Sequence, residues 1–371
     1  MQPGSSSPRA IVIYADETAD WQVAGLRQID RLQCALRDAG LAEPAPLLLS
    51  PEDNLDSLGE GNVLVLNTRL VLGRDFAKKF HTLVFEAAQL RADRALLLEK
   101  LRSSEWPYLM ERSDIPAAAA RLFDRTGKPQ DGIISRFLNR PISRAVSQLL
   151  ARTPITANQL TVLLMLLPLA GALLLGRGDY LGFALGAILF QVHSALDGCD
   201  GEIARVKYLE SEAGAKLDQI CDRLSTLLFA IALGLGLTRA TGAWSYLAEG
   251  ISAAIFIGVA ETYLTRDKIA DELPADRYGN FLSDHRASFN QGDQLKLWLI
   301  RNTGLLSLGE GAASLFGQLT KRDVFNFVFM VLAICGLAAW VLHILAFSAC
   351  LILVLALNEL FAPALGAKSA A

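Results

Sequence analysis

Apolar positions are distributed unevenly along this chain. Up to about residue 150 they alternate with charged positions, whereas long apolar runs dominate the remainder. A run of about 18 or more apolar residues predicts a membrane-spanning helix. Runs such as LTVLLMLLPLAGALLLG have no polar stripe of the kind that the surface helices of soluble proteins carry. The pattern predicts six transmembrane helices, at residues 157–176, 179–198, 216–238, 245–265, 324–342 and 345–365.

The first 130 residues have the pattern of a layered α/β domain. AIVIYAD, at residues 10–16, is a β-branched run, and the amphipathic helical pattern GLRQIDRLQCALRDAG follows it. Two short apolar runs come next, PLLLS and NVLVLN. Alternation of this kind predicts a mainly parallel sheet covered by helices. The expected fold class is therefore an α-helical membrane protein with six transmembrane helices, preceded by an α/β domain.

Residues 131–153 join the two halves. Apolar side chains recur there about every three to four residues, at Ile133, Ile134, Phe137, Leu138, Ile142 and Val146. Four arginines are interspersed with them, namely Arg136, Arg140, Arg144 and Arg152. The pattern predicts an interfacial helix with its apolar face in lipid and its guanidinium groups at headgroup level. Two interpretations stay open: the arginines only anchor the helix, or Arg140 or Arg144 faces the active site and binds a substrate phosphate.

Charge and composition indicate how the chain is oriented. It has 371 residues, of which 52% are hydrophobic, and a net charge of −3 at pH 7. The polar start MQPGSSSPRA does not resemble a secretory signal. Lys and Arg gather in the loops 199–215 and 266–323, which six spans would place on one side. We expect a multi-pass protein of the cell's inner membrane, with the N-terminal domain and these loops in the cytoplasm and no nucleic-acid partner.

Four aspartates lie at the ends of two predicted helices, within HSALDGCDGEIARVKYLESEAGAKLDQICDR. Asp197 and Asp200 share one helix face, and Asp218 and Asp222 share a face of the next helix. Two antiparallel helices would bring the four together, where carboxylates repel one another and cannot all stay ionised alone. Ionisable groups at a membrane are functional by default. Because carboxylate oxygens favour Mg²⁺ or Mn²⁺, we predict a two-metal site with all four as ligands.

The residues between the aspartates fit phosphate chemistry. Gly201 and Ala204 are small enough for a ligand to approach the helix backbone, and Arg205 is a cation suited to phosphate. The full spacing is D-x2-D-G-x2-A-R-x8-G-x3-D-x3-D. The alternative, a solvated charged loop, would not require this spacing.

This motif resembles the signature of the CDP-alcohol phosphotransferases. The matched positions are Asp197, Asp200, Gly201, Ala204, Arg205, Gly214, Asp218 and Asp222. The resemblance implies transfer of a phosphoalcohol group from a CDP-alcohol to an acceptor alcohol, with release of CMP. It also implies that the four aspartates hold the metals, that Asp222 is the general base, and that the protein is a homodimer. Residues implied at the nucleotide are Gly201, Ala204, Arg205, Gly214 and Asn158.

The wider layout looks like the di-myo-inositol-phosphate-phosphate synthase branch, whose N-terminal domain is similar to sugar-nucleotide transferases. Such transferases place a glycine-rich, basic loop after the first strand, because exposed backbone N–H groups bind phosphate. Here that position reads ADETADWQ, and no acidic metal ligand follows the strand in VLNTRLV. We therefore expect residues 1–130 to be a degenerate, structural or regulatory nucleotidyltransferase-like domain, followed by the interfacial helix 131–153 and the membrane domain 154–371.

Several functional alternatives stay open. The donor is either CDP-diacylglycerol or CDP-inositol, and the acceptor is a polar alcohol such as inositol phosphate. The domain layout favours the soluble donor, whereas the membrane setting favours the lipid. A divalent-metal transporter would place its acidic residues in mid-span, while these lie at helix ends beside Arg205. An inactive scaffold would not need the complete motif.

Overall fold

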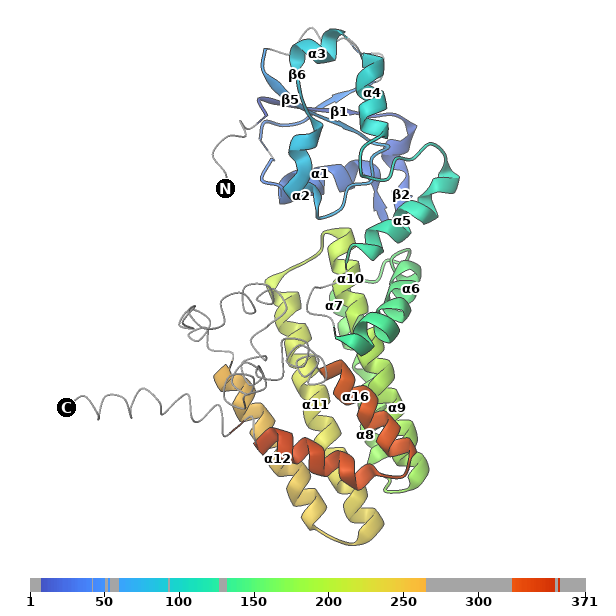
Figure 1. The fold of residues 1–371 in the computed structure, drawn as a ribbon, viewed down its shortest axis with the longest axis vertical. Coiled ribbons are helices and arrows are strands. Elements are labelled where there is room, and N and C mark those ends of the chain that lie inside the picture. Colours follow the sequence, from blue (N-terminus) through green and yellow to red (C-terminus); the bar gives the residue numbers. More distant parts are fainter. Residues whose placement is uncertain are drawn as a thin grey trace, which may run out of the picture. The chain divides into compact units, whose positions relative to one another are not determined.

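The computed structural model describes residues 8–41, 43–50, 53, 60–92, 94–126, 132–264, 322–350 and 353. The chain divides into two compact units. The first comprises Met1–Gly127, Arg144–Ala157 and Cys199–Ser211, and the second comprises Lys128–Ser143, Asn158–Gly198 and Glu212–Ala371. Figure 1 labels the elements of both.

A four-stranded sheet forms the centre of the first unit, with strand order β4-β1-β5-β6. Strand β1 (Ala10–Tyr14) pairs in parallel with β4 (Leu47–Leu49) and β5 (Asn62–Asn67). The edge strand β6 (Val84–Glu86) runs antiparallel to β5. The side chains of β1 and β5 are almost wholly buried, as expected where both faces of a parallel sheet are covered. The strands predicted at AIVIYAD, PLLLS and NVLVLN are therefore confirmed.

Helices and a hairpin complete the first unit. The predicted amphipathic helix is α1 (Gln28–Asp38), which buries Leu32, Ala35 and Leu36 against the sheet. A short hairpin is made by β2 (Gln22–Val23) and β3 (Leu26–Arg27). The other elements are η1 (Glu17–Asp20), α2 (Phe76–Lys79), η2 (Phe80–Leu83), α3 (Ala87–Ala92), α4 (Arg94–Arg102), η3 (Arg112–Asp114) and α5 (Ile115–Asp124).

Helix α10 (Gly198–Lys207), which carries part of the aspartate motif, packs into the first unit from Cys199 onwards. Its Val206 shares a small apolar core with Val23, Leu122 and Ala151. The guanidinium of Arg31 on α1 is fully buried and donates from Nη1 to the Val206 carbonyl at 2.9 Å and from Nη2 to the Val23 carbonyl at 2.7 Å. The α/β domain thus holds the carboxyl end of α10 through one buried cation.

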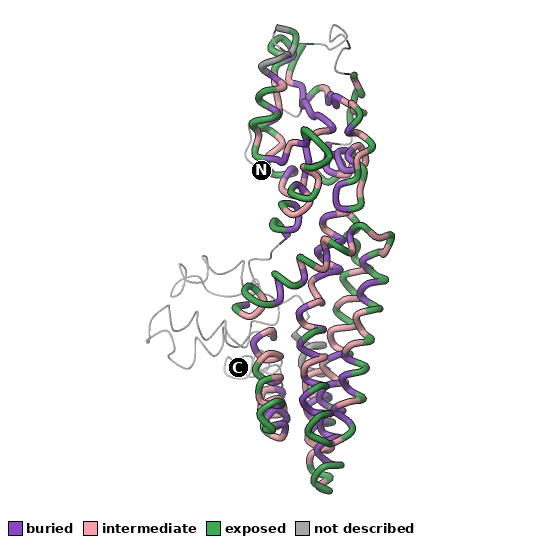
Figure 2. Tube along the Cα trace, turned by 90° about the vertical axis from the view of Figure 1, so that its right-hand side faces the viewer, coloured by how far each residue is buried: buried purple, intermediate pink, exposed green. Residues whose placement is uncertain are grey.

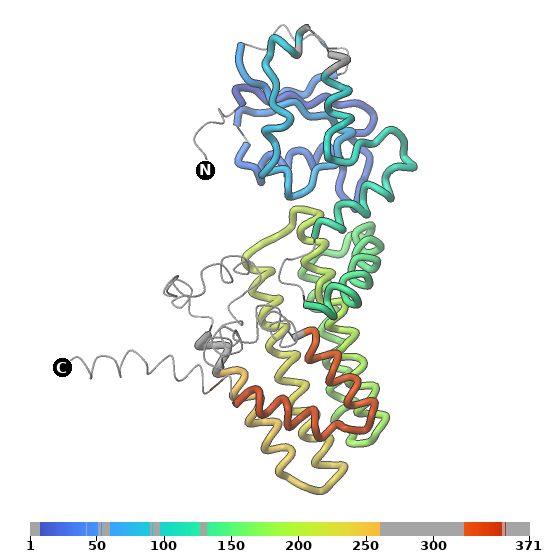
Figure 3. Tube along the Cα trace, in the orientation of Figure 1, coloured from blue at the N-terminus to red at the C-terminus, as the bar shows by residue number. Residues whose placement is uncertain are grey.

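A helical bundle forms the second unit. Its helices are α7 (Ala157–Leu164), α8 (Leu166–Leu175), α9 (Tyr180–Leu196), α11 (Glu212–Thr241), α12 (Ser245–Leu264) and α16 (Arg322–Ile334). Helix α9 packs against α8 and α16, and α11 packs against α8 and α12. Although α16 is distant in sequence, Figure 3 shows it alongside α9. Buried and exposed positions alternate along these helices in Figure 2, and the exposed positions include large apolar residues such as Leu173 and Ile255.

Three helical segments are long and apolar enough to cross a membrane: Ala157–Leu175, Tyr180–Lys207 and Glu212–Thr241. The first is broken at Met165 into α7 and α8, three residues before Pro168, whose nitrogen cannot donate a helical hydrogen bond. The second joins α9 and α10, which agrees with the helical placement predicted for Asp200 and Ala204. The helix runs past residue 198, where the predicted span ended, so the predicted boundary there is wrong. Shorter apolar helices cover Ser245–Val259, Asp323–Ile334 and Ala338–Cys350.

The predicted boundary between the last two spans is also wrong. The prediction placed one helix over 324–342, whereas α16 ends at Ile334 and another apolar helix begins at Ala338. Gly336 has φ +78°, its N–H donates to the Ala333 carbonyl, and the Leu337 N–H donates to the Leu332 carbonyl. This pair of bonds is the glycine-based termination known as a Schellman motif. The predicted segment 345–365 beyond residue 353, and the loop residues 266–321, lie outside the described residues.

Candidate functional site

Three of the four motif aspartates come together in the second unit. Asp197 follows the last turn of α9, and Asp218 and Asp222 lie one turn apart on α11. One carboxylate oxygen from each lies within 4.8 Å of the others. All three side chains are partly exposed. The structure therefore brings together three of the four aspartates that the sequence analysis expected to meet.

Aromatic packing sets the register that brings these carboxylates together. Phe190 on α9 and Phe229 on α11 meet edge to face, with ring centroids 4.9 Å apart. Phe190 lies seven residues before Asp197, and Phe229 lies seven residues after Asp222. Seven residues span about two helical turns, so in antiparallel helices the ring contact places the two aspartates at one level. Phe329 of α16 stacks on Phe229 at 5.9 Å and braces the same contact.

The three carboxylates fit a divalent cation. Mg²⁺ binds oxygen at about 2.1 Å, so opposite ligands of one ion lie about 4.2 Å apart. The observed limit of 4.8 Å exceeds that value by an amount that small side-chain rotations can remove. Three ionised carboxylates this close repel one another, and a cation removes that repulsion. The oxygen-only donor set suits Mg²⁺ or Mn²⁺ better than zinc.

The remaining motif residues on α10 belong to the first unit. Asp200 is 7% exposed and accepts the Gly201 backbone N–H at 2.6 Å. A side chain at Gly201 would lie 3.2 Å from Nη1 of Arg205, so this arginine covers the glycine that we expected to leave room for a ligand. Ala204 is buried. A ligand role for Asp200 stays a prediction from the motif.

The two arginines singled out in the joining helix have different surroundings. Arg140 is 8% exposed, and its Nη1 lies 2.7 Å from where a side chain on Gly198 would begin. Gly198 follows Asp197 directly, so the Arg140 guanidinium lies against the peptide next to the carboxylate group. Arg144 instead lies in the first unit and pairs with Asp124 at 3.4 Å. Arg140 is therefore the better candidate for a phosphate-binding residue.

Two further predicted residues are less informative. Asn158 is exposed in the first turn of α7, and Gly214 is partly exposed in the first turn of α11. Their roles at the nucleotide stay predictions.

Several buried polar residues near the motif escaped the sequence analysis. Asn139 and Gln191 bond to each other inside the second unit, and Asp323 accepts the Ser135 N–H. Glu202 is fully buried and accepts the Ser147 hydroxyl at 2.8 Å. These residues could have been noticed in the sequence, because they are polar residues within or beside apolar runs. The predicted site was instead built on the regularly spaced aspartates.

A polar cluster occupies the sheet edge where a nucleotidyltransferase would need a phosphate loop. Asp16 follows β1, and Thr68 and Arg69 follow β5, its parallel neighbour. Asp16 accepts bonds from the Thr18 N–H and hydroxyl and from Arg69 Nε, the last at 2.6 Å. Burial tends to raise the pKa of Asp16, but the hydrogen bonds from Thr18 and Arg69 together lower it below its usual value. An ion pair thus fills this edge.

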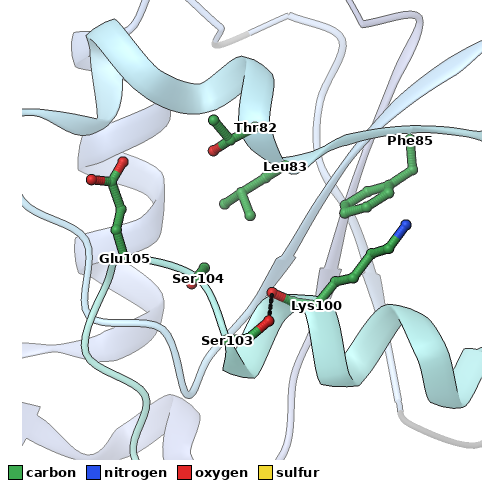
Figure 4. A pocket seen from close by; sticks show the side chains of 7 residues that line it. All are labelled: Thr82, Leu83, Phe85, Lys100, Ser103, Ser104 and Glu105. Atoms are coloured by element: carbon green, nitrogen blue, oxygen red, sulfur yellow. Dashed lines mark hydrogen bonds between the residues drawn. The ribbon is translucent and has the colours of Figure 1, made fainter.

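A hollow of about 370 Å³ in the first unit offers no comparable chemistry. Figure 4 shows its lining of Thr82, Leu83, Phe85, Lys100, Ser103, Ser104 and Glu105. The Lys100 amino group lies 5.7 Å from the centre of the Phe85 ring, and Glu105 pairs with Lys79 at 2.6 Å. Its charges are thus already engaged with neighbouring side chains, and the hollow is not a candidate for phosphate transfer.

Comparison with known families decides the identity of the membrane half. The family model described as CDP-alcohol phosphatidyltransferase matches residues 154–352. The chain belongs to this family. The CDP-alcohol phosphatidyltransferase match contains α7 to α16 and therefore the three clustered carboxylates, as the resemblance at Asp197–Asp222 predicted.

The curated relatives that match this chain are named as transferases or synthases. A "bifunctional IPC transferase and DIPP synthase" of Aquifex aeolicus is 41% identical over 135 residues, covering 36% of this chain and 29% of that protein. The protein of the same name from Archaeoglobus fulgidus is 31% identical over 177 residues, covering 47% and 34%. An "archaetidylinositol phosphate synthase" of Pyrococcus horikoshii is 39% identical over 105 residues, covering 28% and 53%. Each match spans less than two thirds of the relative's length.

Proposed function

We propose that this protein is an integral membrane, metal-dependent transferase. It moves a phosphoalcohol group from a CDP-alcohol to an acceptor alcohol and releases CMP. The observation that carries the proposal is the grouping of Asp197, Asp218 and Asp222 within 4.8 Å, inside a chain of the CDP-alcohol phosphatidyltransferase family. A transporter site would need acidic groups in mid-span, whereas Asp197 directly follows α9 and Asp218 and Asp222 lie in the first half of α11.

The reaction is a substitution at the phosphorus that carries the donor alcohol. The acceptor hydroxyl oxygen forms a bond to this phosphorus, and the bond from the phosphorus to the CMP oxygen breaks. Asp222 takes the proton of the acceptor hydroxyl, and CMP leaves with the electron pair of the broken bond. Asp222 suits this role because it is partly exposed and lies one turn from Asp218, where an acceptor can approach it.

The carboxylates would hold one or two divalent cations. Asp197, Asp218 and Asp222 supply the clustered ligands, and the motif assigns Asp200 as the fourth. When bound, such cations neutralise the diphosphate and stabilise the charge of the departing CMP. The chain's own part is to hold the reacting oxygens in line, through the α9–α11 register fixed by Phe190 and Phe229.

The names of the relatives favour an inositol-phosphate acceptor. Transferases called DIPP synthase point to CDP-inositol as the donor, and we take this as the first candidate. The archaetidylinositol phosphate synthase match favours a lipid donor such as CDP-diacylglycerol as the second. Both donors present the same diphosphate to the carboxylate group and differ in the alcohol beyond it.

The proposed setting is the cell's inner membrane, with six spans, a homodimer, and the α/β domain and carboxylates on the cytoplasmic side. The exposed Phe137 and Ile142 of the joining helix support its placement at the interface. The Asp16–Arg69 pair supports a structural rather than transferring role for the nucleotidyltransferase-like domain.

The decisive experiment measures CMP release by the purified full chain with Mg²⁺ or Mn²⁺. CDP-inositol and CDP-diacylglycerol are compared as donors, with inositol phosphate, glycerol phosphate and serine as acceptors. We expect release with an inositol-phosphate acceptor and a loss of at least about 100-fold in Asp222→Asn. Thr238→Val is a matched control, because its buried hydroxyl on α11 donates to the local Gly234 carbonyl at 2.9 Å, its one bond within the part of the chain that the structure describes.

The donor that supports release separates the two candidates. Release from CDP-inositol alone assigns a soluble-solute synthase, and release from CDP-diacylglycerol assigns a phospholipid synthase. Absence of CMP from both donors at saturating metal, or full activity of Asp222→Asn, would refute the proposal.

A further inference from the structure

The helix that carries Arg140 begins with an irregular turn. Ser135–Asn139 form a π-helix, and α6 (Arg140–Leu150) continues from it. A π-turn holds one residue more than an α-turn, and such turns are frequent at functional sites. The extra residue rotates all later side chains by about 100° relative to the earlier ones. Arg136 and Arg140, which would share a face of a regular helix, are accordingly exposed and buried.

Hydrogen bonds from two other helices hold this turn at both ends. At its start, the Asp323 carboxylate of α16 accepts the Ser135 backbone N–H at 2.5 Å. At its end, Asn139 Oδ1 accepts from Gln191 Nε2 at 3.2 Å, and Asn139 Nδ2 donates to the Ser194 carbonyl at 3.4 Å. Both Gln191 and Ser194 belong to α9, the helix that ends beside Asp197. The π-turn is therefore fixed relative to the carboxylate group.

We call the hydrogen bonds that join Asn139 to Gln191 and Ser194 the clamp. Arg140 is the residue that directly follows Asn139. Asn139 contacts α9 at Ser194, and Arg140 lies one turn further along the chain, beside Gly198 at the start of α10. A side chain at Gly198 would begin 2.7 Å from Arg140 Nη1, so the guanidinium lies close against this glycine. A planar cation is thus held against the residue that follows Asp197. Guanidinium groups in such positions bind phosphate through paired hydrogen bonds.

The clamp is not optimal for stability. Gln191 is 6% exposed, and its Oε1 has no hydrogen-bond partner among the described residues. A buried acceptor left without a partner destabilises the folded state, and such groups in native structures often belong to functional arrangements. An apolar side chain of the same length would avoid this cost, so the amide is better explained by the bond that it donates to Asn139.

We propose that Asn139 and Gln191 are positioning residues that hold the Arg140 guanidinium beside Asp197, where it binds the phosphate of a substrate. This inference rests on the proposed function. Arg140 contacts substrate, whereas Asn139 and Gln191 act only through it. The phosphate belongs either to the diphosphate of the donor or to the acceptor, and kinetics with each substrate varied in turn distinguish the two.

The test uses CMP release by the full chain in Mg²⁺. We expect Arg140→Ala to raise the KM of one substrate by about 30-fold and Arg140→Lys by about tenfold, because lysine lacks the planar fork. Asn139→Ala and Gln191→Met should each raise the same KM by about tenfold while changing kcat and the other KM by less than about twofold. Added guanidine should partly restore Arg140→Ala.

A double-mutant cycle separates positioning from a structural role. If Asn139 acts through Arg140, then Asn139→Ala adds nothing once Arg140→Ala is present. Gln191→Met should leave the melting temperature unchanged or raised, because it removes the unpartnered Oε1. Thr238→Val again serves as the control and should change neither KM.

Clear results would overturn the inference. They are additive effects of Asn139→Ala and Arg140→Ala, an unchanged KM in Arg140→Ala, or a lowered melting temperature of Gln191→Met with unchanged KM. In each case an active wild type and an inactive Asp222→Asn would leave the proposed function standing. A wild type that releases no CMP would instead refute the proposed function itself.

Discussion

Some candidate functional residues could be predicted from the sequence and others could not. Asp197, Asp218 and Asp222 were predictable, because a helix of about 3.6 residues per turn converts their spacing into a shared face. Asn139 and Gln191 were not, because nothing in a lone amide indicates which distant residue it bonds. Arg31 looked like one more residue on the polar face of an amphipathic helix, yet its side chain is fully buried.

The pKa of Asp16 gives a prediction at this scale. Hydrogen bonds from Thr18 and Arg69 outweigh burial and lower its pKa in the folded state. Asp16 therefore stabilises the fold above its unfolded pKa of about 3.9, and this contribution is lost as pH falls through the lower folded value. We expect the stability difference between wild type and Asp16→Asn to be constant near neutral pH and to shrink below about pH 4.

Thermal unfolding of both proteins across pH 3 to 7, followed by fluorescence, would measure this difference. Asp20→Asn is a suitable control, since Asp20 is highly exposed and its contact with Arg27 is long, at 3.5 Å. A difference that grows on acidification would contradict the assignment of Asp16 as the stabilising ionised partner.

Secondary-structure elements were predicted well where periodicity was regular and poorly where one residue breaks it. The strands of the α/β domain and helix α12 lie where the pattern placed them. The π-turn at Ser135–Asn139 could not be predicted from the local sequence, because hydrogen bonds from the distant helices α9 and α16 stabilise it. The end of α16 has a sequence signal, because Gly336 follows its last turn. The signal was missed because the residues around Gly336 are apolar and were assigned to one continuous span.

Gly336 provides the prediction for this scale. Its φ of +78° is strained for any residue with a side chain, so Gly336→Ala should destabilise the protein by about 1 kcal/mol. Gly258→Ala in α12 is the matched control, because a side chain there meets no atom of the described residues within 4 Å and φ is not positive. The control should be neutral or slightly stabilising. Equal melting temperatures of the two variants in detergent would argue against the glycine termination.

For the molecule as a whole, the sequence indicated a soluble half and a membrane half, but not how the motif is shared between them. Cys199–Ser211, and with it Asp200 and Arg205, packs with the α/β domain rather than with the bundle. Arg31 is central to this packing, since it donates to a carbonyl on α10 and to another on β2. Burial lowers its pKa to about 10, which still leaves it charged at neutral pH.

Removing this cation should weaken the attachment of α10. Arg31→Met leaves two carbonyls without their charged donor, and we expect a loss of about 3 kcal/mol. That loss corresponds to a melting temperature lower by roughly 6–12 °C for a unit of this size. Arg37→Met on the same helix is the control, because Arg37 is exposed. Matching melting curves for the two variants, measured by tryptophan fluorescence, would show that Arg31 does not hold α10.

The Asp16–Arg69 pair also bears on how this protein can evolve. A new phosphate loop at that sheet edge would require both charges to be removed, yet either substitution alone leaves the other charge, about one fifth exposed, without its partner at 2.6 Å. The first of the two substitutions is therefore expected to destabilise the domain, whichever residue changes first. Such a pair is an evolutionary barrier: a phosphate loop could arise at this edge without a destabilised intermediate only if both residues changed together.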